Sequence, residues 1–186
     1  MIGYAFCGSF CTLSASLAAL RALLARGYEV QPIMSETVYT TDTRFYKADA
    51  LREEVEALCR RPIIHTIVDA EPLGPKTPLD YLIVSPCTGN TLAKMAHGIT
   101  DTAVTMACKA HMRTGRPLLL ALASNDAMSA NLQSLAALLL RKGVYLVPLA
   151  QDDPEKKPAS LVADFTRVGE AFDAMRKGQQ LRPLFL

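Results

Sequence analysis

The sequence lacks a charge excess and a long hydrophobic run. Its 186 residues carry 20 Lys plus Arg against 18 Asp plus Glu, a formal net charge of +2 at pH 7. Nucleic-acid-binding domains and proteins that adhere to acidic membranes concentrate positive charge, and this near balance argues against both classes. No apolar stretch reaches the roughly 18 residues that span a bilayer, and the first residues carry no charge that would open a signal peptide. We therefore expect a cytoplasmic protein that binds no nucleic acid and no membrane.

Two phosphate-binding motifs are also missing. No Gly-x-x-x-x-Gly-Lys-Ser/Thr occurs, and no Gly-x-Gly-x-x-Gly follows the first apolar segment. These absences argue against a P-loop nucleotidase and against dinucleotide binding by this chain. The five cysteines are odd in number and form no Cys-x-x-Cys pair, so we expect reduced, mostly buried thiols. Cys7 and Cys11 have no second pair that would complete a site, and we predict no metal.

The chain does contain a repeated alternation of apolar runs and helical periodicity. We predict strands at 1–7, 28–34, 63–68, 80–84, 118–123 and 144–149. We predict helices at about 13–26, 49–60, 90–97, 101–113 and 125–142, and a last helix capped by Ser160. Repeated strand–helix units predict an α/β fold, a doubly wound parallel sheet with helices on both faces. Without a break in composition we expect one domain over 1–186, ending in a helix and an apolar tail at about 159–186. That tail either packs on its own domain or docks on a neighbouring protomer.

Small polar residues gather where four predicted strands end, at Gly8–Thr12, Ser35–Thr37, Ser85–Asn90 and Ser124–Asp126. The carboxyl ends of parallel strands share one edge of a sheet, where ligands bind at the switch point. Backbone N–H groups at helix starts, with hydroxyls beside them, hold a phosphate without a lysine. Two interpretations stay open: ordinary caps and turns, or one wall of an anion or nucleotide site. A mononucleotide such as FMN suits the second.

Candidate acid–base residues are few, because His65, His97 and His111 are the only histidines. His97 precedes Gly98 near a predicted helix end, where a cation favours the helix dipole. His111 lies within a helix and is interpreted as a surface or packing residue. His65 lies in an apolar segment and is either a hydrogen-bonded core histidine or a catalytic candidate.

Three segments carry a resemblance to a known family. GSFCTLSASL from position 8, SPCTGNTLAKMAHGITD from position 85 and NDAMSANLQSL from position 125 resemble the homo-oligomeric flavin-containing cysteine decarboxylase-like flavoproteins. The resemblance implies a three-layer, Rossmann-like or flavodoxin-like fold with FMN at the strand ends, in a homo-oligomer such as a trimer or dodecamer. Carried onto the matching positions, the implied FMN-binding residues are Gly8, Ser9, Ser35, Ser85, Thr88, Asn90 and Thr91.

A narrower resemblance covers nearly the whole chain. TTDTRF at 40–45, IVDAEPLGP at 67–75 and the segment 121–165 resemble the family of dipicolinate synthase B subunits. This resemblance implies work with a nicotinamide-binding partner, the A subunit of dipicolinate synthase, which brings NADPH or NADP. It further implies that the two proteins together oxidise a dihydrodipicolinate-type precursor to dipicolinate during sporulation, in the mother cell of a spore-forming bacterium.

Such a substrate is a small dicarboxylate that needs hydrogen-bond donors, and Arg44, Asn125 and Asn131 are candidates. The sequence departs from the decarboxylase pattern at Ser129, where the family has asparagine, and at His65, whose spacing to the next strand is long. Two alternatives to an oxidoreductase component stay open. One is a flavin-free, non-catalytic partner that stabilises the A subunit, and the other is an FMN-dependent decarboxylase.

Overall fold

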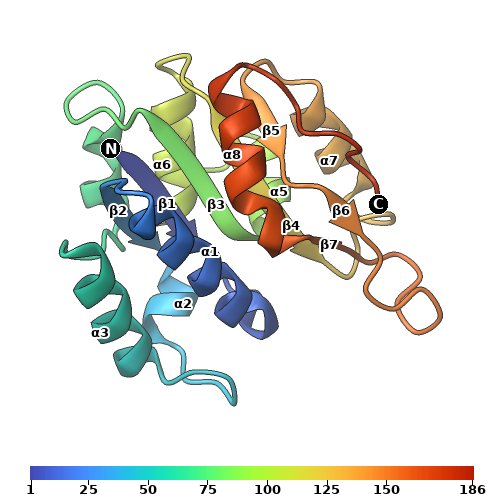
Figure 1. Ribbon diagram of the computed structural model, residues 1–186, viewed down its shortest axis with the longest axis horizontal. Coiled ribbons are helices and arrows are strands. Elements are labelled where there is room, and N and C mark those ends of the chain that lie inside the picture. Colours follow the sequence, from blue (N-terminus) through green and yellow to red (C-terminus); the bar gives the residue numbers. More distant parts are fainter.

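The structure, a computed structural model, describes residues 1–186 as three layers around one sheet (Figure 1). Seven strands pair in the order β2-β1-β3-β4-β7-β6, with β5 also paired to β4. The strands are β1 Ile2–Phe6, β2 Val30–Met34, β3 Tyr81–Thr88, β4 Leu118–Ser124, β5 Val144–Leu146, β6 Leu149–Ala150 and β7 Leu161–Ala163.

Helices cover both faces of the sheet. In Figure 1, α1 and α8 cross the near face, and α5, α6 and α7 lie behind the sheet. The α-helices are α1 Leu13–Ala25, α2 Glu36–Thr40, α3 Ala48–Cys59, α4 Ile67–Ala70, α5 Gly89–Ala96, α6 Ala103–Met112, α7 Leu132–Leu139 and α8 Val168–Arg176. Three 3-10 turns complete the set: η1 Phe10–Thr12, η2 Glu71–Leu73 and η3 Phe165–Arg167. No helix is long and apolar enough to cross a lipid bilayer.

The central strands are buried because both faces of the sheet are covered. Every residue of β1 and β4 is buried, and only the two end residues of β3 are partly exposed. Such continuous apolar strands are typical of parallel sheets. All pairs among β1 to β5 are parallel, whereas β7 runs antiparallel to both β4 and β6. The predicted doubly wound α/β fold is thus confirmed, with an antiparallel edge that the sequence pattern did not predict.

The predicted strand at 63–68 is wrong. Only Ile64 reaches the sheet, through a single parallel bridge to Ile33. The Thr66 side chain accepts a hydrogen bond from the Asp69 N–H and caps α4. This cap makes the segment begin a helix, although its apolar run is typical of a strand. Val68 is consequently 80% exposed.

Two predicted helices are shorter than expected. Residues 125–131 form turns, in which the carbonyl of Asp126 accepts hydrogen bonds from the N–H groups of Ser129 and Asn131, and α7 begins only at Leu132. Ser160 caps no helix, because the next residues form β7 and α8 begins at Val168. The face predicted for the last helix is nevertheless buried, at Phe165, Val168, Phe172 and Met175.

The predicted strand at 144–149 is divided into β5 and β6 at Pro148, which has no N–H to continue a ladder. The C-terminal tail packs on its own chain beside β6. The Leu149 N–H donates to the Leu184 carbonyl at 2.8 Å, and the Leu186 N–H donates to the Leu149 carbonyl at 2.9 Å. Phe185 and Leu186 remain 57% and 56% exposed.

Candidate functional site

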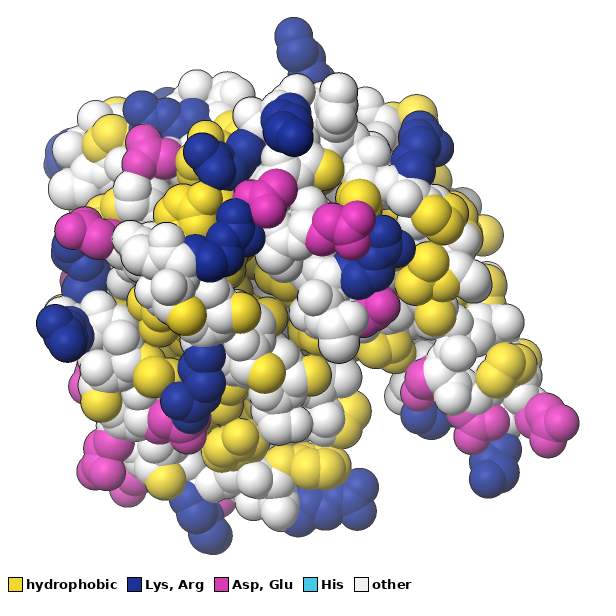
Figure 2. Space-filling model, viewed as in Figure 1, with side chains coloured by type: hydrophobic (Ala, Val, Ile, Leu, Met, Phe, Trp, Pro, Cys, Tyr) yellow, Lys and Arg dark blue, Asp and Glu magenta, His cyan; other side chains and the backbone are white.

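A cleft of about 630 Å³ opens at the carboxyl ends of β1, β3 and β4. Its walls are the loops that follow these three strands and the loop 151–158, which joins β6 to β7. Figure 2 shows that loop as an arm with acidic and basic side chains, separated from the body by a gap. β2 lies on one side of β1 and β3 lies on the other, so the direction of winding reverses between β1 and β3. The cleft is therefore at the switch point of the sheet.

The loop after β1 forms one wall. The Gly8 N–H has no hydrogen-bond partner in the chain, although the neighbouring N–H groups of Cys7 and Ser9 are paired. The Thr12 hydroxyl donates to the Ser9 carbonyl at 2.9 Å and lies 3.0 Å from the Ser9 hydroxyl oxygen. This bond holds the 3-10 turn that leads into α1, and leaves the Gly8 donor available to a ligand.

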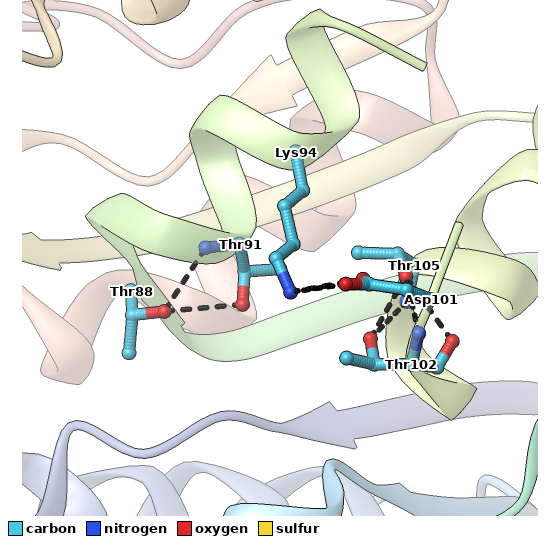
Figure 3. Close-up of polar contacts among 6 residues, drawn as sticks. All are labelled: Thr88, Thr91, Lys94, Asp101, Thr102 and Thr105. Carbon is cyan, nitrogen blue, oxygen red and sulfur yellow. Dashed lines mark hydrogen bonds and ion pairs between the residues drawn. The ribbon is translucent and has the colours of Figure 1, made fainter. Parts of the chain in front are cut away.

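The start of α5 forms the second wall. The Thr88 Oγ1 accepts the Thr91 N–H at 3.2 Å and lies 3.0 Å from the Thr91 Oγ1, as Figure 3 shows. Thr88 is therefore the N-cap, and the N–H groups of Gly89 and Asn90 at the helix start have no partner within the helix. The macrodipole adds a partial positive charge at this end, which favours an anion. Thr91 does not itself line the cleft, because its hydroxyl bonds back to Thr88.

Gly89 lets three segments meet closely. A Cβ at this position would lie 2.5 Å from both the Asn131 Nδ2 and the Ser124 Oγ. Real Cβ atoms do not approach other atoms so closely, so only glycine brings α5, the end of β4 and the turn before α7 together here. Ser124 in turn accepts the Asp126 N–H at 3.2 Å, which fixes the turn.

Three asparagines from different loops line the cleft with free amides. Asn90, Asn125 and Asn131 make no side-chain hydrogen bond to the rest of the chain. Each amide offers two donor hydrogens and an acceptor oxygen, so together they can bind several polar atoms of one ligand. The structure thus brings together Gly8, Ser9, Thr88, Asn90, Asn125 and Asn131 of the residues predicted from the sequence.

Three charged residues also line the cleft, and none of them is among the binding residues predicted from the sequence. Lys157 Nζ lies 2.7 Å from Asp152 Oδ2, within the loop 151–158, and Asp126 lines the cleft from the turn after β4. The hydrogen bond from Lys157 lowers the pKa of Asp152, and the same bond raises the pKa of Lys157. Both groups are therefore charged at neutral pH. The prediction that N–H groups and hydroxyls hold a phosphate without a lysine did not include Lys157, which lines the same cleft.

Ser85 is not in the cleft. Its hydroxyl is buried and lies 3.0 Å from both the Tyr4 hydroxyl and the Ser16 Oγ, while its carbonyl accepts the Ser16 hydroxyl at 2.6 Å. Burial raises the pKa of Tyr4 to about 12, so its hydroxyl stays protonated as a donor. The three side chains join β1, α1 and β3, which is a packing role.

Three further predicted residues lie outside the cleft lining. The Ser35 hydroxyl is buried at the end of β2 and has no hydrogen-bond partner. The His65 ring stacks on Tyr39, with 3.7 Å between ring centroids and 10° between planes. Arg44 is exposed, with its guanidinium 4.8 Å from the centre of the Phe45 ring. The structure therefore provides no histidine and no arginine in the cleft.

Comparison with known proteins places this geometry in a family. Residues 2–167 match the flavoprotein family. The B subunit of dipicolinate synthase from Bacillus subtilis (strain 168) is 38% identical over 185 residues, which cover 100% of this chain and 92% of that protein. The crystal structure of the dipicolinate synthase B subunit from Bacillus halodurans C aligns with a TM-score of 0.91 at 37% identity, over 100% of this chain and 95% of that one.

A more distant likeness concerns the fold alone. The FMN-dependent cysteine decarboxylase SpaF aligns with a TM-score of 0.68 at 22% identity, over 95% of each chain. The sequence matches run through the loops that line the cleft, from the loop after β1 to the arm at 151–158. This chain belongs to the flavoprotein family.

Proposed function

We propose that this chain is the FMN-binding B subunit of a dipicolinate synthase and that FMN binds in the cleft at the switch point. The observation that carries the proposal is the convergence of unpaired donors from three strand ends on one cavity of about 630 Å³. This size lies within the range of about 300–1,000 Å³ that is usual for cofactor sites. The full-length likeness to the dipicolinate synthase B subunits of two Bacillus species supports the choice of enzyme.

The residues present fit the cofactor. The Gly8 N–H and the N-terminus of α5, with Ser9 and Thr88 beside them, suit the phosphate. The amides of Asn90, Asn125 and Asn131 suit the polar atoms of the ribityl chain and ring, and one of them remains for a substrate carboxylate. Ser35, Ser85 and Thr91 are left out, because their side chains lie outside the cleft lining.

The proposed reaction converts a dihydropyridine dicarboxylate to the aromatic pyridine dicarboxylate, with loss of one hydride and one proton. Bound FMN supplies a hydride acceptor. The chain's own part is to orient the dicarboxylate through amides and backbone N–H groups. The relatives are B subunits by name, which supports a second protein in the enzyme. For that partner we propose a nicotinamide-binding A subunit, whose NADP is the final acceptor of the hydride, while the proton is released to solvent.

A second candidate function is a flavin-free partner that stabilises the A subunit. The observation in its favour is the charge of the cleft, where Asp126 and Asp152 outnumber Lys157. A net negative charge disfavours a dianionic phosphate. The decarboxylase alternative is less well supported, because no histidine lines the cleft.

One experiment separates these functions. The chain is purified alone, titrated with FMN by flavin fluorescence, and then combined with the A subunit, NADP and a dihydrodipicolinate precursor. The proposal expects saturable FMN binding and formation of dipicolinate that depends on FMN. If the chain binds no FMN but its addition still raises the turnover of the A subunit, the flavin-free partner is supported instead. Release of carbon dioxide from a peptide with a C-terminal cysteine supports the decarboxylase.

A further inference from the structure

A second pocket lies at the opposite edge of the sheet from the cleft. It has a volume of about 360 Å³ and is formed near the amino ends of β4 and β5, where α5, α6 and α7 end. Five of its thirteen lining residues are basic and none is acidic: Lys109, Arg113, Arg116, Arg141 and Lys142. The net charge of the whole chain is only +2, so this concentration is local.

None of these five cations has an ion-pair partner. The acidic residue nearest in sequence to the lining is Asp101, and Lys94 Nζ already holds its two carboxylate oxygens at 2.9 and 2.8 Å (Figure 3). Asp80 pairs with the N-terminal amine of Met1, which lowers the pKa of Asp80, and Arg116 contributes a smaller lowering. The pocket cations are therefore not neutralised by the chain itself.

Helix dipoles account for only part of this charge. Three helices direct their C-terminal ends, each equivalent to about −0.5 of an elementary charge, toward the pocket. Five full positive charges exceed this sum of about −1.5, which leaves a surplus of roughly +3.5. Moreover, Arg116 lies in no helix, and its Nη1 donates to the Leu79 carbonyl at 3.0 Å, which fixes its position at the pocket rim.

The rest of the lining favours a small molecule over a flat protein surface. Met95, Ile99 and Met112 supply an apolar wall, and the basic groups come from two segments, 109–116 and 141–142, around a concave space. Arginine binds phosphate and carboxylate groups through paired hydrogen bonds, and a compact apolar body suits the methionines. We propose that this pocket binds a small organic polyanion, with phosphate or carboxylate groups on a compact body, at a site separate from the cleft.

The test uses the full chain with FMN bound, so that the cleft is occupied. Pyrophosphate and citrate, neither of which is the substrate or product of the proposed reaction, are titrated calorimetrically, and the better binder identifies phosphate or carboxylate chemistry. We expect the double variant Arg113→Gln/Arg141→Gln to weaken binding at least about tenfold. The matched control Arg60→Gln/Arg182→Gln, which removes the same charge at exposed sites elsewhere, changes the affinity less than about twofold.

A second readout keeps the test independent of folding defects. Bound probe should protect Lys109 and Lys142 from acetylation in the unmodified protein, measured by mass spectrometry, while Lys76 stays reactive. Equal affinity in both double variants overturns the proposal. The absence of binding by both probes also overturns the proposal. If, in that case, the pocket variant loses affinity for the A subunit, the pocket is a contact for an acidic protein surface instead.

Discussion

Lys157 Nζ lies 2.7 Å from Asp152 Oδ2, and this pair brings the only lysine of the cleft to its edge. The two side chains are 44% and 32% exposed, so solvent screens their attraction. The pair therefore matters more for the charge that a ligand meets than for folding.

Lys157→Gln should weaken FMN binding by about tenfold, because the cleft loses its only lysine and with it the attraction of that charge for the phosphate. Asp152→Asn should strengthen binding, because it removes a repelling carboxylate and frees the lysine. Flavin fluorescence titration measures both. The neighbouring Lys156→Gln, which changes a residue outside the cleft lining by the same charge, serves as control. Equal effects of the two lysine substitutions would show that only overall charge matters.

Ser85→Ala and Asn90→Ala should affect different properties: the first should lower stability, and the second should weaken FMN binding. Ser85→Ala removes a buried hydroxyl from the network with Tyr4 and Ser16 and should lower the free energy of unfolding by about 1–2 kcal/mol, with FMN affinity unchanged. Asn90→Ala should leave stability almost unchanged and weaken FMN binding by about fivefold. Urea denaturation and flavin titration of both variants test the assignment, which fails if Ser85→Ala is the one that loses flavin.

Gly89→Ala should destabilise the fold by about 1–3 kcal/mol and impair the cleft, since its Cβ would overlap the Asn131 amide and the Ser124 hydroxyl. Gly8→Ala, in the same cleft, is the matched control. Its Cβ would meet the Thr37 Cγ2 at 3.4 Å, an ordinary contact, so we expect a change below about 1 kcal/mol. Thermal unfolding of the two variants distinguishes close packing at Gly89 from a general preference for glycine.

His111 should make stability depend on pH. Its Nε2 lies 2.9 Å from the Pro117 carbonyl and must donate to it, whereas the buried Nδ1 has no partner. Burial lowers the pKa of His111, so the unfolded chain binds the proton more readily. Stability is then full above the ordinary value of about 6.5 and falls as the pH drops through it toward the folded-state pKa.

The measurement is the free energy of unfolding as a function of pH, compared with His111→Gln, which retains a donor for the Pro117 carbonyl. The difference between the two proteins should change between about pH 6.5 and the lower folded-state value and stay constant above. A constant difference over the whole range would rule out titration of His111.

One cysteine should react with a thiol reagent in the native protein, and five after denaturation. Cys11 is exposed and lines the cleft, whereas the other four are buried. Burial raises the pKa of both Cys7 and Cys59 to about 11 and also raises those of Cys87 and Cys108, which keeps them as inert thiols. FMN should slow the modification of Cys11. More than one reactive thiol in the native state would contradict the packing described here.

The sequence pattern predicted the parallel part of the sheet well, because burial on both faces leaves continuous apolar runs at β3 and β4. It failed where a local signal opposed the pattern. Thr66 caps a helix within an apolar run, and Leu161 continues the apolar periodicity of α8 although it lies in β7. At Leu161 the pairing of β7 with β4 determines that the residue is in a strand. Such long-range pairing cannot be predicted from a short stretch of sequence.

Most of the cleft residues that the sequence predicted lie at or just beyond the end of a strand. Thr88 is the last residue of β3, Asn125 directly follows β4, and Gly8 comes two residues after β1. Ser85 lies outside the cleft lining because it is inside β3, where its side chain points into the packed interior. Lys157 could not be found from spacing, since only the return of the chain through β7 brings its loop to the cleft.

The antiparallel edge connects the cleft to the carboxyl-terminal end of the chain. β7 pairs with Ala123 and Ser124 at the rim of the cleft, and its hairpin partner β6 bridges to Phe185 in the last residues of the chain. The arm at 151–158 therefore begins and ends in strands that belong to one continuous ladder. The exposed Phe185 and Leu186 are connected to the cleft rim through this hairpin.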